Sequence, residues 1–88
     1  MTESLSVKVI SPQNLLFFGK ATSVSSRNTS GNFDVLPEHT SFITIIIQSP
    51  IVIRPVDSQK ITLTFSIAVM YVTDNNVTIY AQPEAINL

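Results

Sequence analysis

The chain has no cysteine, a single histidine and only two glycines among its 88 residues. Without cysteine it can form neither a disulfide framework nor a thiolate metal site. Because His39 is the only imidazole and the acids stand singly, a transition-metal centre is not expected either. The sequence also lacks the glycine-rich loops that hold phosphates, GxxxxGK[ST] and GxGxxG. We therefore expect no cofactor and no bound metal.

Groups that could catalyse a reaction are equally scarce. His39 has Glu38 beside it but no second imidazole and no thiol anywhere in the chain. Serines are plentiful enough to complete a Ser-His-Asp set on paper, yet no nucleophile elbow or glycine-rich oxyanion turn is present. The simplest interpretation of His39 is a loop histidine bonded to nearby backbone, and a partner contact is the next. We predict that the chain is not an enzyme by itself.

Charge is sparse as well. Charged residues make up 12% of the chain and the net charge is −1, where about 25% charged is usual. The five basic residues are scattered, so nothing forms a stripe that could follow a phosphate backbone, and nucleic-acid binding is not expected. Two interpretations remain: a compact β-protein with uncharged polar faces, or a subunit that hides part of its surface in a permanent partner. The low charge favours the second.

Long apolar runs are missing too. The longest, around 43–47 and 67–72, fall well short of the ~18 residues of a membrane-spanning helix. The segment 1–4 lacks the basic and apolar regions of a signal peptide. The sequence thus predicts a cytoplasmic protein, which could still rest against a membrane complex.

What the chain does contain is alternation of apolar and polar residues, punctuated by turn residues. Alternation is typical of half-buried strands, and helical periodicity is absent up to 82. We expect an all-β fold, an antiparallel β-sandwich of many short strands, formed by 1–82 as one domain with 83–88 as a short tail. The expected strands are 5–9, 15–18 closed by Gly19-Lys20, 21–27, 42–47, 51–56, 61–72 and 77–81.

Three of these strands carry more detailed expectations. The β-branched run 42–47 predicts a strand near the centre of the core. Pro55 indicates a sheet edge or a bend. In 61–72, alternate apolar residues from Ile61 to Tyr71 share one predicted face, as one strand increasingly covered on both sides or as two strands joined by a bend near Ala68. Asp74-Asn75-Asn76 predicts a hairpin turn.

The stretch 31–42 differs from the rest. It enters as a strand, breaks at Leu36-Pro37 and continues through a polar loop that contains the only histidine. In its setting it resembles the N-terminal β-sandwich domain of the epsilon subunit of rotary F-type ATP synthases. That family shows an ordered series of motifs, and the corresponding pieces here are Val7-Lys8-Val9-Ile10-Ser11-Pro12, Leu16-Phe17-Phe18-Gly19, Gly31-Asn32-Phe33-Asp34-Val35-Leu36-Pro37-Glu38-His39, Ser66 and Val77-Thr78-Ile79-Tyr80-Ala81.

Some positions depart from the family pattern. Asp34 and Glu38 replace family glycines, Thr40-Ser41 replaces Ala-Pro, and Ile67-Ala68 replaces Gly-Gly. Loss of glycine affects tight turns, because other residues adopt positive φ only at a cost in free energy. Pro83-Glu84 stands where the family's C-terminal helical hairpin would begin.

The resemblance implies a non-catalytic rotor subunit that links the gamma subunit to the c-ring and so couples ion-driven rotation to ATP synthesis. It assigns the c-ring side to Asn32, Glu38, His39 and Thr40, and the gamma side to Ser11. It also implies a peripheral location on the cytoplasmic face of a bacterial inner membrane or an equivalent energy-coupling membrane. The alternative is a ligand-binding or adhesive β-sandwich, such as a carbohydrate-binding module, which would need exposed aromatic rings or clustered acids. Most aromatic residues are expected on core faces, Tyr80 excepted.

Overall fold

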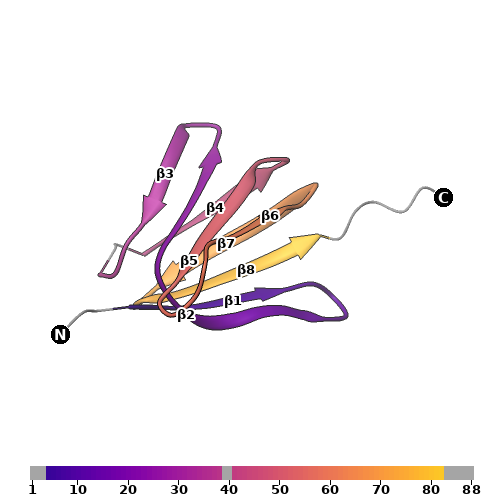
Figure 1. Ribbon diagram of the computed structural model, residues 1–88. Helices are drawn as coiled ribbons and strands as arrows, with labels where there is room; N and C mark the ends of the chain where they lie inside the picture. The colour runs from indigo at the N-terminus through magenta and orange to yellow at the C-terminus, as the bar shows by residue number, and fades with distance from the viewer. Residues whose placement is uncertain (1–3, 39–40, 83–88) are drawn as a thin grey trace.

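The computed structural model describes residues 4–38 and 41–82. Within them the chain forms eight strands and no helix, which confirms the predicted all-β class (Figure 1). The strands are β1 (Leu5–Ile10), β2 (Leu15–Asn28), β3 (Gly31–Val35), β4 (Phe42–Ile47), β5 (Pro50–Pro55), β6 (Ile61–Thr64), β7 (Ile67–Thr73) and β8 (Asn76–Gln82). The division into a domain of 1–82 and a tail stays a prediction, because the tail 83–88 lies outside the described residues.

The strands form one sheet, in the order β4-β7-β8-β1-β2-β5-β6 with β3 added beside β2, and this sheet curls into two facing layers (Figure 1). Every pairing is antiparallel apart from β1 with β8, which is parallel. The exception arises because β8 returns from a hairpin with β7 and lies along β1 in the same direction. The Ser6 N–H donates to the Asn75 carbonyl at the start of this pair, 2.8 Å away.

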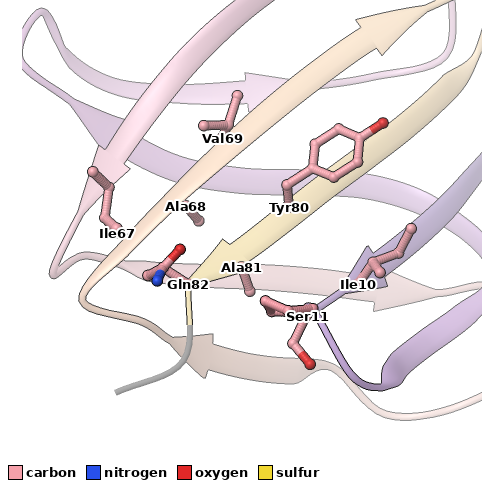
Figure 2. A pocket seen from close by; sticks show the side chains of 9 residues that line it. Ile10, Ser11, Ile67, Ala68, Val69, Tyr80, Ala81 and Gln82 are labelled. Atoms are coloured by element: carbon pink, nitrogen blue, oxygen red, sulfur yellow. The ribbon is translucent and has the colours of Figure 1, made fainter. Parts of the chain in front are cut away.

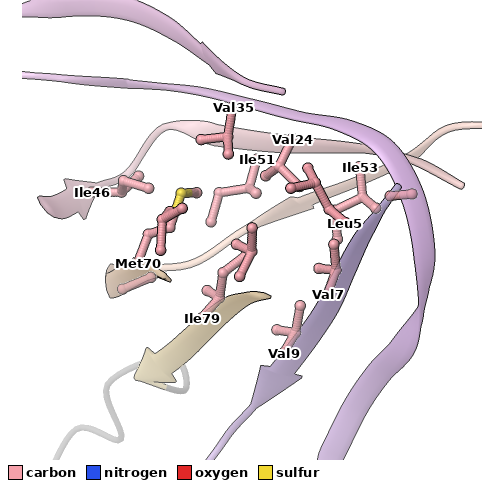
Figure 3. Packing of buried hydrophobic residues seen from close by; sticks show 14 of the residues in the cluster. Leu5, Val7, Val9, Val24, Val35, Ile46, Ile51, Ile53, Met70 and Ile79 are labelled. Atoms are coloured by element: carbon pink, nitrogen blue, oxygen red, sulfur yellow. The ribbon is translucent and has the colours of Figure 1, made fainter. Parts of the chain in front are cut away.

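The core lies between the two layers (Figure 3). The strands predicted at 5–9 and 77–81 bury alternate side chains as expected, since Val7 and Val9 of β1 and Val77 and Ile79 of β8 are fully buried. The opposite layer contributes buried side chains from β2 and β5. The core residues are Leu5, Val7, Val9, Ala21, Val24, Val35, Ile46, Ile51, Ile53, Ala68, Met70, Val72, Val77, Ile79 and Ala81.

Strand β2 is longer than predicted. The expectation of two strands separated at Gly19-Lys20 is wrong, because the chain stays extended from Leu15 to Asn28. Gly19 pairs with Val7, and a Cβ at Gly19 would stand 3.3 Å from the ring of Phe17. This glycine therefore makes room for a ring within a strand and does not end it. An irregularity between Ala21 and Ser23 marks where β2 leaves β1 and joins the second layer.

The β-branched sequence of β4 predicted a strand near the centre of the core. The structure instead places β4 at the end of the sheet order. Ile46 points into the core, while the alternate residues Ile43, Ile45 and Ile47 are 65%, 53% and 58% exposed. The β-branched preference fits an extended backbone at any position in a sheet, so it does not report which position a strand takes.

The segment 61–73 forms two strands, which agrees with the second of the two predicted alternatives. The break falls at Phe65 and Ser66, slightly before the expected bend. It also changes which face points inward: Leu63 packs against the core, but in β7 the inward residues are Ala68, Met70 and Val72. The prediction that all alternate residues from Ile61 to Tyr71 share one face is therefore wrong.

Strand β5 lies between β2 and β6, so of the two alternatives predicted from Pro55, an edge or a bend, the edge is wrong. Pro55 is the last residue of β5 and pairs with Ala21, beside the irregularity in β2. Just beyond it, the Val56 N–H donates to the Lys20 carbonyl at 3.0 Å. The missing N–H of proline is thus accommodated at the end of the ladder, where proline is tolerated.

Among the described residues, the non-glycine residues with positive φ are Glu38, Gln48, Asp74 and Asn75. Asp74 and Asn75 have φ of 50° and 63°, the pattern of a type I′ hairpin, which confirms the predicted turn between β7 and β8. Glu38, at a family glycine position, has φ of 66°. Asp34 shows no such backbone and sits within β3. Of these two positions, at which the resemblance implies glycine, only Glu38 therefore has a strained backbone.

Our first prediction concerns the two faces of β4. Ile46→Ala removes side-chain volume from the core and should lower the free energy of unfolding by about 2–5 kcal/mol. Ile45→Ala, one residue away on the exposed face, should change it by less than about 1 kcal/mol. Urea unfolding of both variants measures the difference. Equal effects would show that β4 is not half-buried in the way described.

A second prediction concerns the strained turn. Glu38→Gly should raise the free energy of unfolding by about 1 kcal/mol, because glycine adopts positive φ without steric cost. The Glu38 N–H that donates to Asn75 Oδ1 is retained in this variant. Asp34→Gly is the matched control and should destabilise by about 1 kcal/mol, since it weakens a strand and removes the bond from Ser25 Oγ. Thermal unfolding of the pair reports the sign, and destabilisation by Glu38→Gly would contradict the turn geometry.

Candidate partner-binding surface

The layer formed by β4, β7, β8, β1 and the first half of β2 has an apolar outer surface. Its outward side chains line up in rows set by the strand register. One row runs from Ile45 through Val69 and Tyr80 to Ile10. We call this outer surface the apolar face; its other members are Ile43, Ile47, Ile67, Tyr71, Leu16 and Phe18.

The exposure of these side chains is high. Phe18 is 66% exposed and Tyr80 is 52% exposed, and each outward isoleucine of β4 is more than half exposed. Phe18 and Tyr71 were expected on core faces, and for these two the expectation is wrong. Soluble monomers rarely expose a contiguous apolar patch larger than a few hundred Å², and such patches mark interaction sites.

A hollow of about 440 Å³ indents one end of the apolar face (Figure 2). Val69 and Tyr80 project beside it from neighbouring strands. Ser11, the residue that the resemblance assigns to the gamma side, lies at its rim, and its hydroxyl bonds with the backbone of Asn14 at 3.2–3.3 Å. The hollow is lined by Ile10, Ser11, Pro12, Ile67, Ala68, Val69, Tyr80, Ala81 and Gln82.

Of the other predicted contact residues, the structure describes Asn32 and Glu38. Glu38 lies in the turn after β3, where its N–H donates to Asn75 Oδ1 of the β7–β8 hairpin. Asn32 is exposed near the start of β3, and five residues separate it from Glu38, of which 33–35 belong to the strand. His39 and Thr40 lie outside the described residues.

The outer surface of the second layer is polar by contrast. The Arg54 guanidinium donates to the hydroxyls of Ser23 and Ser25, at 3.5 and 3.2 Å. Ser25 in turn donates to the Asp34 carboxylate. These polar groups hydrogen-bond to one another, so the two outer surfaces of the domain differ in kind.

Neither a cluster of metal ligands nor a membrane-spanning helix is found in the described part of the chain. In residues 4–38 and 41–82, no three potential metal ligands gather. No helix there is long and apolar enough to cross a membrane. The candidate site is therefore the apolar face itself. The sequence did not reveal it, because the residues of 43–47 and 67–71 that compose it were assigned to the core.

Comparison with known proteins identifies the family of this chain. The sequence pattern of the family described as "ATP synthase, Delta/Epsilon chain, beta-sandwich domain" matches residues 4–85. An ATP synthase epsilon chain of Corynebacterium aurimucosum is 31% identical over 78 residues, covering 88% of this chain and 64% of the relative. One of Brevibacillus brevis is 26% identical over 78 residues, covering 89% of this chain and 59% of the relative. The chain thus spans about three fifths of the curated relatives it matches.

Solved structures share the fold. A chain in the Euglena gracilis mitochondrial ATP synthase (OSCP/F1/c-ring) superposes with a TM-score of 0.80 at 14% identity, covering 89% of this chain and 50% of that one. A chain in the central stalk/c-ring of the Tetrahymena thermophila mitochondrial ATP synthase superposes with a TM-score of 0.74 at 14% identity. The match covers 92% of this chain and 65% of that one. The fold, the order of its motifs and the family pattern all agree, and this chain belongs to the β-sandwich family of ATP synthase delta/epsilon chains.

Proposed function

We propose that this domain is a non-catalytic part of the central stalk of an F-type ATP synthase, joining the gamma subunit to the c-ring so that ring rotation is passed to the stalk. Family membership supports this proposal, as does the fold shared with a chain from a central stalk and c-ring. The observation that carries it is the apolar face, which has no use in a domain that works alone. The domain would then sit on the cytoplasmic side of an energy-coupling membrane, held there by its partners.

We assign the gamma subunit to the apolar face. Five strands at ~4.8 Å spacing and six residues at ~3.3 Å rise give a flat area of about 500 Å². A standard interface buries about 800 Å² per partner, so the face could supply most of it. Ser11 at the rim of the hollow fits the same assignment.

We assign the c-ring to the turn that follows β3, with Glu38, His39 and Thr40 as its contacts. The backbone bond from Glu38 to Asn75 ties this turn to the β7–β8 hairpin, so a force on the turn is passed directly into the sheet. Asn32 is also proposed as a c-ring contact. Because Asn32 lies in β3 and Glu38 in the turn that follows it, a ring contact that includes both must extend along β3.

A carbohydrate-binding module is the rival with some support, because Phe18, Tyr71 and Tyr80 present exposed rings on one surface. Sugar binding also requires polar groups beside the rings to fix the hydroxyls. The neighbours of these rings are mainly isoleucine and valine. This composition suits a protein partner better.

The gamma assignment is tested by co-purification with the cognate gamma subunit. The unaltered domain should form a stable complex, and Ile45→Asp should weaken binding by about 30-fold or more, because it places a charge in a dehydrated interface. Thr62→Asp, on the outer surface of β6, is the matched control and should bind normally. Titration calorimetry measures both. A wild-type domain that stays free of gamma would contradict the proposal.

The same assay extended to gamma bound to the c-ring tests the turn. His39→Ala should leave unfolding nearly unchanged and should weaken attachment to the ring without affecting gamma binding. Should His39→Ala unfold the domain, its side chain would be structural and the contact role would be lost.

A further inference from the structure

Two lysines stand at one corner of the apolar face. The register pairs Lys8 with Phe18 and Ser6 with Lys20, so both lysines project outward from β1 and β2 as diagonal neighbours. Diagonal neighbours on paired strands lie about 7–8 Å apart. Both residues are exposed. The corner is therefore a compact positive patch beside an apolar surface.

Both ammonium groups lie near neutral groups of the face. Lys20 Nζ donates to Ser6 Oγ at 2.9 Å, and Lys8 Nζ lies 6.0 Å from the centroid of the Phe18 ring. Among residues 4–38 and 41–82, neither ammonium contacts a carboxylate. The strand segments that make up the face, 5–10, 15–20, 42–47, 67–73 and 76–82, contain no acidic residue at all. The strands of the face therefore supply no acidic counterpart to the positive charge of this corner.

This charge limits what can cover the face. A second copy of the chain, packed with its own apolar face, would bring no carboxylate from its face strands to meet the lysines. Covering an unpaired charge is costly, because the water that solvated it is removed without compensation. Of the possible occupants, a different protein with acidic side chains at the right place is therefore favoured.

We propose that the surface which docks on the apolar face carries acidic side chains opposite Lys8 and Lys20, and that these lysines fix the orientation and speed of docking. The inference rests on the proposed function, in which that surface belongs to the gamma subunit. Complementary charge at the edge of an interface acts mainly on the association rate and on specificity, while the apolar area supplies affinity. The lysine corner thus selects the register in which the two subunits meet.

The test is the association rate of the full chain with the cognate gamma subunit, measured by stopped flow at about 20 mM and about 500 mM salt. Lys8→Glu and Lys20→Glu should each slow association about 5–10-fold at low salt and very little at high salt, where charges are screened. Lys60→Glu changes the net charge equally but lies between β5 and β6, outside the face, and should change the rate less than about 2-fold. The association rates of Lys8→Gln and Lys20→Gln should lie between those of the wild type and of the corresponding glutamate variants.

The outcomes separate this inference from the proposed function. If gamma binds and Ile45→Asp weakens it, but the lysine reversals behave like Lys60→Glu, the lysine inference is overturned and the gamma assignment stands. If the wild-type chain does not bind gamma, both fail. Should Lys20→Glu lower the melting temperature through loss of the Ser6 bond, the Lys8 variants decide between the outcomes, since the Lys8 ammonium is held by the Phe18 ring instead. Restoration of the rate by an acid-to-lysine change on gamma would confirm the pairing.

Discussion

The hydrogen bonding of β2 to both layers is the constraint on which the rest of the structure depends. Its first half pairs with β1 and its second half with β5 and β3. One continuous strand thus brings the two layers face to face over the core. Because side chains alternate along every strand, fixing the inner face of each layer also fixes which residues point outward.

The two outer surfaces that result differ strongly, and this difference links the fold to its proposed role. On the outer surface of the second layer, Ser, Asp and Arg side chains hydrogen-bond to one another. On the apolar face, rows of isoleucine, valine and tyrosine lie exposed. A rotor part must transmit force without deforming, and a closely packed sandwich with a broad attachment surface meets that need. The strained Glu38 turn is anchored to the β7–β8 hairpin, at one end of that surface.

The sequence predicted correctly the strands in which apolar and polar residues alternate clearly. It failed where both faces of a strand are apolar, because alternation then does not show which face is buried. Val7, Val9, Val77 and Ile79 were placed correctly, as was the Asp74-Asn75 turn. In β4 both faces are largely apolar, so alternation cannot tell the buried face from the exposed one, and its edge position depends on pairing with the distant β7. The break at 65–66 is invisible for a related reason, since the apolar residues continue in step across it. The attachment surface consists of residues whose exposure only the full topology reveals.

The central claim is that the apolar face is covered by the gamma subunit, and the absence of native cysteine makes a direct test simple. Single cysteines placed by Ile45→Cys on this face and Thr62→Cys on the opposite one can be labelled with a maleimide in the presence and absence of gamma. We predict that gamma slows labelling at position 45 by about 10-fold or more and leaves position 62 unchanged, because an interface core excludes water and solutes. Protection at 62 with free labelling at 45 would contradict the account.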